Sequence, residues 1–150
     1  MRSLLVAVLF LSACTDQAVA DRFETDLPAG MTSVQTAAGV ARIARTYLLE
    51  QESQLAAPEL HIEPDVVSVT LRPARQAPSV EPRVPSALAE AAGDDLVWVV
   101  AVAGDVFDHA VLPWSDGVQA HPCGSIVISD SDGAILGVFP HHDLPSSDCP

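Results

Sequence analysis

The apolar run from Leu96 to Ala103 limits the possible folds of this chain more than any other feature. Outside the N-terminal segment it is the most apolar part of the sequence, and it is rich in valine, whose branched side chain favours β-strands. A strand without polar alternation is typical of the interior of a sheet. We therefore predict that 96–103 is a central strand.

Two further apolar segments, 125–129 and 134–139, flank residues 130–133, which read Asp-Ser-Asp-Gly. An Asp-Gly pair between two apolar runs is a strong signal for a β-hairpin. The same residues resemble part of a calcium-binding loop, but Ile128 and Phe139 occupy two further positions where such a loop needs carboxylates. The segment is therefore predicted to be a turn.

The segment from Val34 to about Leu55 has the spacing of an amphipathic helix. Thr32 to Gln35 matches a capping box, which predicts that the helix begins there, and Pro58 would end it. A membrane-binding helix would usually be richer in Lys and Arg on its polar face, so we interpret the apolar face as core. The residues of this face are Ala37, Val40, Ala41, Ile43, Ala44, Tyr47, Leu48 and Leu55.

Strict alternation from Val66 to Arg72 predicts a half-buried strand, with Val67, Val69 and Leu71 on its buried side. The following segment, 73–85, is rich in proline, which cannot donate the hydrogen bonds of a strand. It is therefore predicted to be an excursion over the surface.

The order of elements predicts an α+β fold, with one N-terminal helix packed on a mainly antiparallel sheet of about four strands. A short helix is predicted over 85–92, and 105–124, with its Pro and Gly residues, is predicted to be irregular. A chain of 150 residues has room for one such domain. We assign this domain to 32–150, with a Pro-rich excursion at 73–85.

The charge of the chain excludes some classes of function. It has 20 Asp and Glu against 7 Lys and Arg, a formal net charge of -13 and a pI near 4.4. Electrostatic attraction to nucleic acid is therefore absent. All of the basic residues are arginines, which excludes a lysine nucleophile and the lysine of a P-loop.

The N-terminus has the pattern of a bacterial secretion signal. Arg2 precedes an apolar stretch that is too short to span a membrane, and Leu11-Ser12-Ala13-Cys14 follows. These four residues resemble the lipobox of bacterial lipoproteins. The resemblance implies cleavage after Ala13 and acylation of Cys14, which becomes the new N-terminus.

We accordingly interpret 1–13 as a lipoprotein signal peptide and 14–31 as the lipidated cysteine followed by an acidic, solvated tether. More than one acyl chain makes such an anchor stable. The alternative is an ordinary secretion signal cut near Ala20, which would remove Cys14. The lipoprotein interpretation places the domain at a cell membrane or outer membrane, facing the periplasm or the exterior.

The predicted helix, the aromatic-containing strand around Trp98, and the hairpin sequence from Asp130 to Gly137 together resemble the small PepSY-type module of secreted and membrane-attached bacterial proteins. The resemblance covers about residues 32–139. The chain departs from it in the Pro-rich excursion and in its Cys-containing tail. The resemblance implies a non-enzymatic binding or inhibitory domain that acts on an envelope protein or peptidase.

If Cys14 is lipidated, Cys123 and Cys149 remain as a pair. In the oxidising compartment outside the cytoplasmic membrane we expect them to form a disulfide, which would enclose the predicted hairpin. A redox-active pair is the alternative, although the Cys-x-x-Cys spacing typical of such pairs is absent.

Several residue types that bind zinc gather near the C-terminus. They are His121, Cys123, His141, His142, Asp143 and Cys149. Their spacing matches no common zinc motif, and the alternative is a polar, solvated tail after Pro140. We assign no metal ligand and no cofactor, and keep a metal-binding envelope protein as the alternative function.

Trp114 is the candidate binding residue, because an aromatic side chain on an irregular connection can anchor a partner. Packing against the sheet edge is the alternative. Asp108 and His109 could form an acid–base pair, but no nucleophile motif stands beside them, so no catalytic residue is assigned. The sequence thus predicts a lipid-anchored envelope protein with a non-enzymatic binding or regulatory domain.

Overall fold

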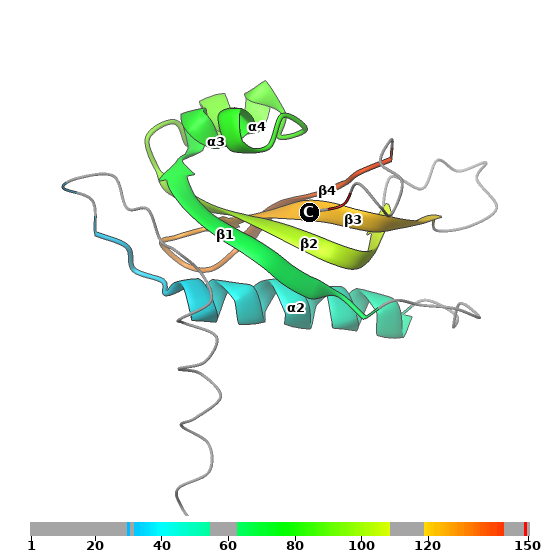
Figure 1. Ribbon diagram of the computed structural model, residues 1–150. Helices are drawn as coiled ribbons and strands as arrows, with labels where there is room; N and C mark the ends of the chain where they lie inside the picture. Colours follow the sequence, from blue (N-terminus) through cyan, green and yellow to red (C-terminus); the bar gives the residue numbers. More distant parts are fainter. Residues whose placement is uncertain (1–29, 31, 55–62, 109–118, 143–148, 150) are drawn as a thin grey trace, which may run out of the picture.

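A four-stranded antiparallel sheet with helices on both faces forms the centre of the computed structural model (Figure 1). The structure describes residues 30, 32–54, 63–108, 119–142 and 149. The predicted α+β fold, with one N-terminal helix on a sheet of about four strands, is confirmed. The elements along the chain are α2 (Ala37–Gln54), β1 (Asp65–Pro73), the 3-10 helix η1 (Ala74–Gln76), α3 (Ala77–Val80), α4 (Ser86–Ala92), β2 (Leu96–Asp108), β3 (Gln119–Ser129) and β4 (Ile135–Pro140).

The strands lie in the order β1-β2-β3-β4, and every neighbouring pair is antiparallel. The predicted central strand is confirmed, because 96–103 forms most of the inner strand β2. Trp98 on β2 pairs with Leu71 of β1 on one side and with Ile128 of β3 on the other. The predicted hairpin is also confirmed, as β3 and β4.

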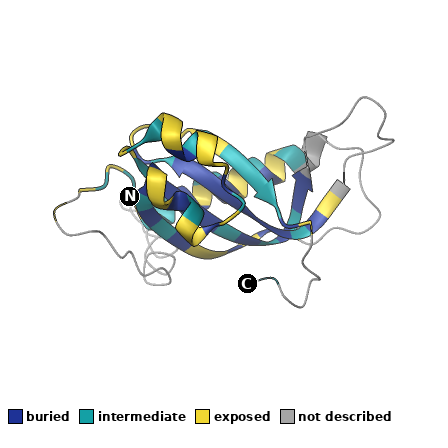
Figure 2. Cartoon of the chain, turned by 90° about the horizontal axis from the view of Figure 1, so that it is seen from above, coloured by how far each residue is buried: buried dark blue, intermediate teal, exposed yellow. Residues whose placement is uncertain are grey.

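The sheet has a separate apolar core on each face. Alternate residues of β2 point to opposite sides, so Trp98 and Val100 contribute to the core beneath α2, while Val97 and Val99 contribute to the core beneath η1, α3 and α4. Burial on both sides explains why this strand shows no polar alternation. Figure 2 shows the buried residues along the strands and the exposed residues on the outer sides of the helices.

Helix α2 packs on the sheet through the apolar face that the sequence predicted, with Val40, Ala41, Ala44 and Leu48 buried. Its predicted start was wrong. The helix begins at Ala37, and the hydroxyl of Thr36 accepts a hydrogen bond from the main-chain NH of Gly39 at 3.1 Å.

Strand β1 covers the predicted segment, but the predicted side of Val67 is wrong. The register against β2 shifts between Val66 and Ser68, as in a β-bulge, so Val66 is buried and Val67 is 37 % exposed. Beyond the bulge, Val69 and Leu71 are buried as predicted.

The Pro-rich segment 73–85 is not a surface excursion. It forms η1 and α3, and its Ala74, Ala77 and Val84 are buried in the second core. Proline prevents this segment from pairing as a strand, but it leaves small side chains free to pack on the sheet. The predicted helix over 85–92 is confirmed as α4.

The prediction that 105–124 is irregular is wrong at both ends. β2 continues to Asp108 and β3 begins at Gln119. A bulge interrupts the β2–β3 register between Ala103 and Val106, and Gly104 adopts φ 104° there, a conformation that a side chain would disfavour. Both strands continue to pair beyond this bulge.

Candidate functional site

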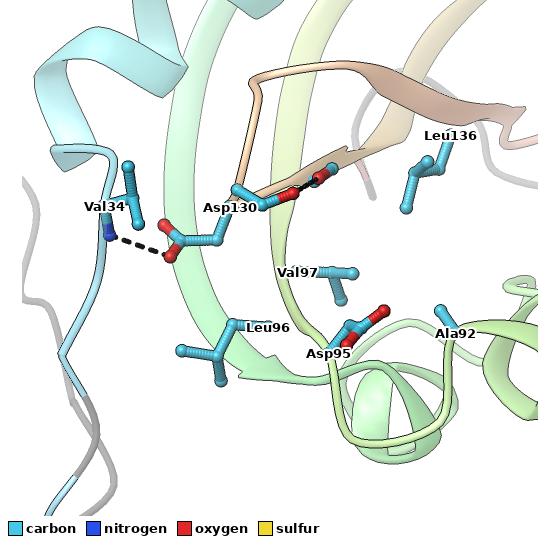
Figure 3. A pocket seen from close by; sticks show the side chains of 9 residues that line it. Val34, Ala92, Asp95, Leu96, Val97, Asp130 and Leu136 are labelled. Atoms are coloured by element: carbon cyan, nitrogen blue, oxygen red, sulfur yellow. Dashed lines mark hydrogen bonds between the residues drawn. The ribbon is translucent and has the colours of Figure 1, made fainter.

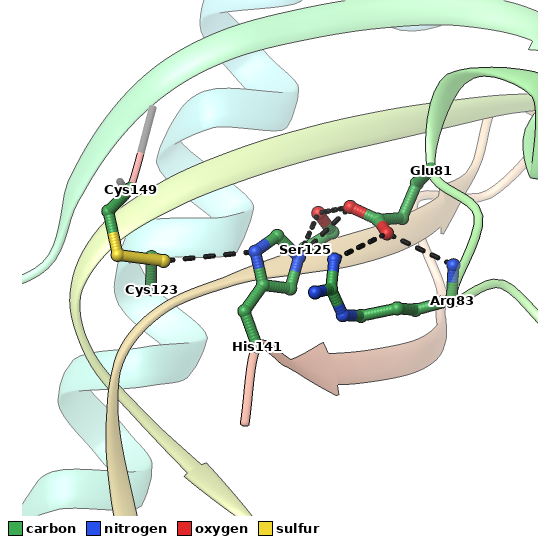
Figure 4. A network of polar contacts seen from close by, with 6 residues as sticks. All are labelled: Glu81, Arg83, Cys123, Ser125, His141 and Cys149. Carbon is green, nitrogen blue, oxygen red and sulfur yellow. Dashed lines mark hydrogen bonds and ion pairs between the residues drawn. A yellow bond between two sulfur atoms is a disulfide. The ribbon is translucent and has the colours of Figure 1, made fainter. Parts of the chain in front are cut away.

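Three polar side chains from different parts of the chain meet in the interior (Figure 4). We call these three residues the buried polar cluster. Glu81 follows α3, Ser125 lies on β3 and His141 follows β4. The Ser125 hydroxyl donates to Glu81 Oε2 at 2.6 Å, and His141 Nε2 lies 2.9 Å from the same oxygen and 3.3 Å from Ser125 Oγ. The three residues are 6 %, 1 % and 4 % exposed, respectively.

The second carboxylate oxygen of Glu81 faces Arg83. The main-chain NH of Arg83 donates to Oε1 at 3.1 Å, and the guanidinium lies 3.5 Å from the same atom. Burial raises the pKa of Glu81, but hydrogen bonds from Ser125 and Arg83 and the charge of His141 outweigh that effect and lower it below its ordinary 4.5. Glu81 is therefore a carboxylate at neutral pH.

His141 is neutral under the same conditions. Burial lowers its pKa below the ordinary 6.5, and Arg83 and His142 act in the same direction, while Glu81 opposes them. Because a carboxylate only accepts hydrogen bonds, the imidazole proton lies on Nε2 and is donated to Glu81. Nδ1 then carries a lone pair, and it lies 3.7 Å from Sγ of Cys123.

Cys123 and Cys149 are joined by a disulfide, with their Cα atoms 5.8 Å apart. The bond links Cys123 on β3 to a residue 26 positions later, so the rest of β3, β4 and His141 lie inside the closed loop. A loop of this size typically contributes about 3 kcal/mol by restricting the unfolded chain.

The buried polar cluster does not have the geometry of a serine hydrolase. In such an enzyme the two imidazole nitrogens face the serine and the acid separately. Here Ser125 and Glu81 both meet Nε2, and the serine proton is donated to the carboxylate.

The interpretation of the residues after Pro140 as a solvated tail is wrong for His141. This residue is buried and links three segments of the chain through the cluster.

The remaining C-terminal histidines form a second contact. The rings of His121 and His142 meet edge to face with their centroids 4.1 Å apart. Across the part of the chain that the structure describes, no three His, Cys, Asp or Glu residues are placed to share a metal ion. Asp143, which also belongs to the predicted set of zinc-binding residue types, lies outside the described residues.

Asp130 holds the segment before α2 against the sheet, an arrangement that we call the Asp130 clamp. Its carboxylate accepts hydrogen bonds from Ser33 Oγ at 2.5 Å, the main-chain NH of Val34 at 2.8 Å, that of Gln35 at 3.1 Å, and Trp98 Nε1 at 2.7 Å. Burial opposes ionisation of Asp130, which is 3 % exposed, but these bonds lower its pKa below the ordinary 3.8. The predicted capping box fails because the main-chain NH of Gln35, from which the Thr32 hydroxyl would accept, donates to Asp130 instead.

Residues 130–133 form the predicted turn. Asp132 Oδ1 accepts a hydrogen bond from the main-chain NH of Ala134 at 3.1 Å, and Gly133 adopts φ 73°, which favours glycine. The carboxylates of this segment thus serve the hairpin and the clamp.

A groove of about 350 Å³ lies beside the clamp, and we call it the Val34 groove (Figure 3). Its rim carries two exposed apolar side chains, Val34 at 70 % and Leu136 at 39 %. Its lining includes Val34, Ala92, Asp95, Leu96, Asp130 and Leu136. The groove therefore combines apolar surface with carboxylates.

Several sequence predictions lie outside the described residues. These are the lipidated Cys14 with its signal and most of the tether, Trp114, and His109. Asp108 ends β2. None of the described helices has the length and apolar character needed to cross a membrane.

Comparison with known proteins gives no relative: no family model, no curated protein and no solved structure matches this chain.

Sequence reasoning missed both polar arrangements. Trp98 carried a usable signal, because an indole NH in a buried strand needs an acceptor and Asp130 is a nearby candidate across the sheet. The cluster of Glu81 and Ser125 had no such signal, since its members are far apart in sequence and each is unremarkable locally.

Proposed function

We propose that this chain is a lipid-anchored protein of the bacterial cell envelope, and that its folded domain is a non-enzymatic module that binds a partner through the Val34 groove. The lipobox-like Leu11 to Cys14 supports the anchor. A disulfide fits the oxidising compartment that such an anchor implies.

The observation that carries the binding proposal is the exposure of Val34. Main-chain hydrogen bonds to Asp130 hold Val34 and Gln35 in place, yet the Val34 side chain remains 70 % exposed beside the groove. An exposed apolar side chain on a main chain that is already fixed can contact a partner at a reduced ordering cost.

The chemistry of the groove favours an apolar side chain within a basic protein segment. Val34, Leu96 and Leu136 offer apolar contacts. Asp95 lies at the groove, and the chain as a whole carries a net charge of -13, which attracts a cationic partner. The PepSY resemblance agrees with a partner of this kind, an envelope protein or peptidase.

The position of the groove suits an anchored protein. Residues 33–35 follow the proposed tether directly and form part of the clamp. A partner in the groove would therefore bind at the end of the domain from which the tether departs. Trp114 remains a proposed second contact.

A hydrolytic role for Ser125 is not proposed, because this residue is buried in the polar cluster and donates its proton to Glu81. Metal binding is not proposed either, because a disulfide joins the two cysteines of the C-terminal set and His141 is bound in the cluster.

The experiment compares capture of envelope proteins by the full chain and by two matched variants. Leu136→Asp places a charge on the rim of the groove, and Leu49→Asp places the same charge on α2 at nearly the same exposure, 38 % against 39 %. We expect one basic partner to bind the parent and Leu49→Asp but not Leu136→Asp. Equal capture by all three proteins would refute the groove as the binding site.

A further inference from the structure

We propose that the Cys123–Cys149 disulfide is a thiol–disulfide exchange site, in which a thiol attacks Cys149 and the sulfur of Cys123 leaves beside His141. The proposal is independent of the Val34 groove. It assigns a chemical activity to residues that the proposed binding function does not use.

The two cysteines differ in exposure. Cys123 is 0 % exposed on the inner strand β3, whereas Cys149 lies on the final described segment and is partly exposed. Access to each sulfur decides which one a thiol attacks. The attacking thiolate therefore reaches Cys149, and Cys123 is the leaving group.

His141 stands between the leaving sulfur and a carboxylate (Figure 4). Its Nδ1 lies 3.7 Å from Sγ of Cys123, and its Nε2 lies 2.9 Å from Oε2 of Glu81. This is the order of groups that stabilises a thiolate: a sulfur, an imidazole, and an acid that orients the imidazole. A disulfide with only a structural role does not require this order.

The exchange step balances as follows. The sulfur of an incoming thiol loses its proton and bonds to Cys149 Sγ, while the bond between Cys149 and Cys123 breaks and its electron pair remains on Cys123. The released proton is taken up at Nδ1 of His141, which leaves a thiolate beside an imidazolium. A second thiol then attacks the mixed disulfide, so two thiols are oxidised to one disulfide and the protein gains two thiol groups.

The charges around His141 determine when this stabilisation acts. Glu81 favours the imidazolium, Arg83 and His142 disfavour it, and Ser125 is a neutral neighbour. The new thiolate on Cys123 adds a second negative charge beside the ring, so proton uptake accompanies breakage of the disulfide. Below the pKa of His141 the ring is already charged before the thiol attacks.

The incoming group is a thiolate, which can come from a small thiol or from a protein cysteine. The test uses glutathione and, separately, reduced thioredoxin with the purified full chain, and follows free thiols by alkylation and mass spectrometry. The rate is divided by the thiolate concentration between about pH 5 and about pH 8, which removes the ionisation of the reductant itself. The faster reductant identifies the kind of thiol that the site accepts.

We expect the rate per thiolate to rise about tenfold toward acid pH, because a stabilised leaving sulfur departs faster. His141→Gln should remove this rise, and Glu81→Gln should shift it to lower pH. His142→Gln, a change at an exposed neighbour on the same segment, should keep the rise and move it to slightly higher pH, because His142 disfavours the imidazolium.

A rate per thiolate that is independent of pH in the parent protein would overturn the proposal. So would a rise that His141→Gln leaves intact, or a rate that does not increase with thiol concentration, which would mean that the bond is reached only on unfolding. If His141→Gln does not fold by circular dichroism, the pH and concentration dependence of the parent protein decide the question alone.

Discussion

The carboxylate of Asp130, in the turn between β3 and β4, accepts a hydrogen bond of 2.8 Å from the main-chain NH of Val34, which lies 96 residues earlier in the chain. This bond fixes the N-terminal segment of the domain to the hairpin at the opposite end of the sequence. It explains why α2 begins after this segment and why Val34 remains exposed beside a groove.

Replacing Asp130 by Asn should destabilise the domain. The carboxylate accepts four hydrogen bonds, whereas an amide has only one acceptor oxygen. The NH₂ group of Asn would therefore face a donor, either the NH of Val34 or the donors that include Trp98 Nε1. We expect a loss of about 2 to 3 kcal/mol in the free energy of unfolding, measured with urea. Asp132→Asn, an exposed position in the same turn, is the control and should behave like the parent. An Asp130→Asn protein as stable as its control would show that the clamp is not a stabilising feature.

Gly124→Ala should also destabilise the domain. A Cβ at this position would lie 2.9 Å from Cγ1 of Val106 and 3.0 Å from the carbonyl oxygen of Phe139, so β3 could not keep its place between its neighbours. Overpacking of this kind costs about 1 to 3 kcal/mol. Thermal and urea unfolding measure the loss, and the double variant Val106→Ala/Gly124→Ala should be more stable than the sum of the two single changes predicts. If the effects of the two single changes simply add in the double variant, the strain caused by Gly124→Ala does not come from contact with Val106.

Stability should decrease in acid in two stages. The pKa values of His141, Glu81 and Asp130 in the folded protein lie below the ordinary 6.5, 4.5 and 3.8. At acid pH the unfolded chain therefore binds more protons at each group than the folded protein does, and the free energy of unfolding falls as pH falls.

Urea unfolding over a pH series measures this effect. The first decline should begin below about pH 6.5, where His141 becomes protonated in the unfolded chain, and the second below about pH 4.5, where the carboxylates do. His141→Gln should remove the first decline and keep the second. If the His141→Gln protein shows a first decline of the same size, a group other than His141 causes that decline.

The strands and the main helix could be predicted from the sequence because their signals are local. The apolar run of β2, the Asp-Gly turn and the apolar face of α2 each reflect the burial of that segment alone. The side of Val67 was mispredicted because a β-bulge adds one residue and reverses the alternation, and the sequence carries no mark of it.

The two polar arrangements depend on contacts between distant residues. The capping-box pattern of Thr32 to Gln35 is not realised, because the main-chain NH of Gln35 donates to Asp130, which also accepts a hydrogen bond from Trp98. In the Pro-rich segment, proline correctly excluded a strand, yet Ala74 and Val84 still pack on the sheet. Glu81 is positioned by that packing, which no local pattern reveals.

The lipid anchor at Cys14 is the central claim of the proposed function, and metabolic labelling with palmitate in a bacterial host tests it most directly. The account predicts that the parent chain is labelled and that its mature form begins at an acylated Cys14, while Cys14→Ser is neither labelled nor cleaved after Ala13. A Cys14→Ser protein that still takes up label, or a mature parent chain that begins near Asp21, would contradict it.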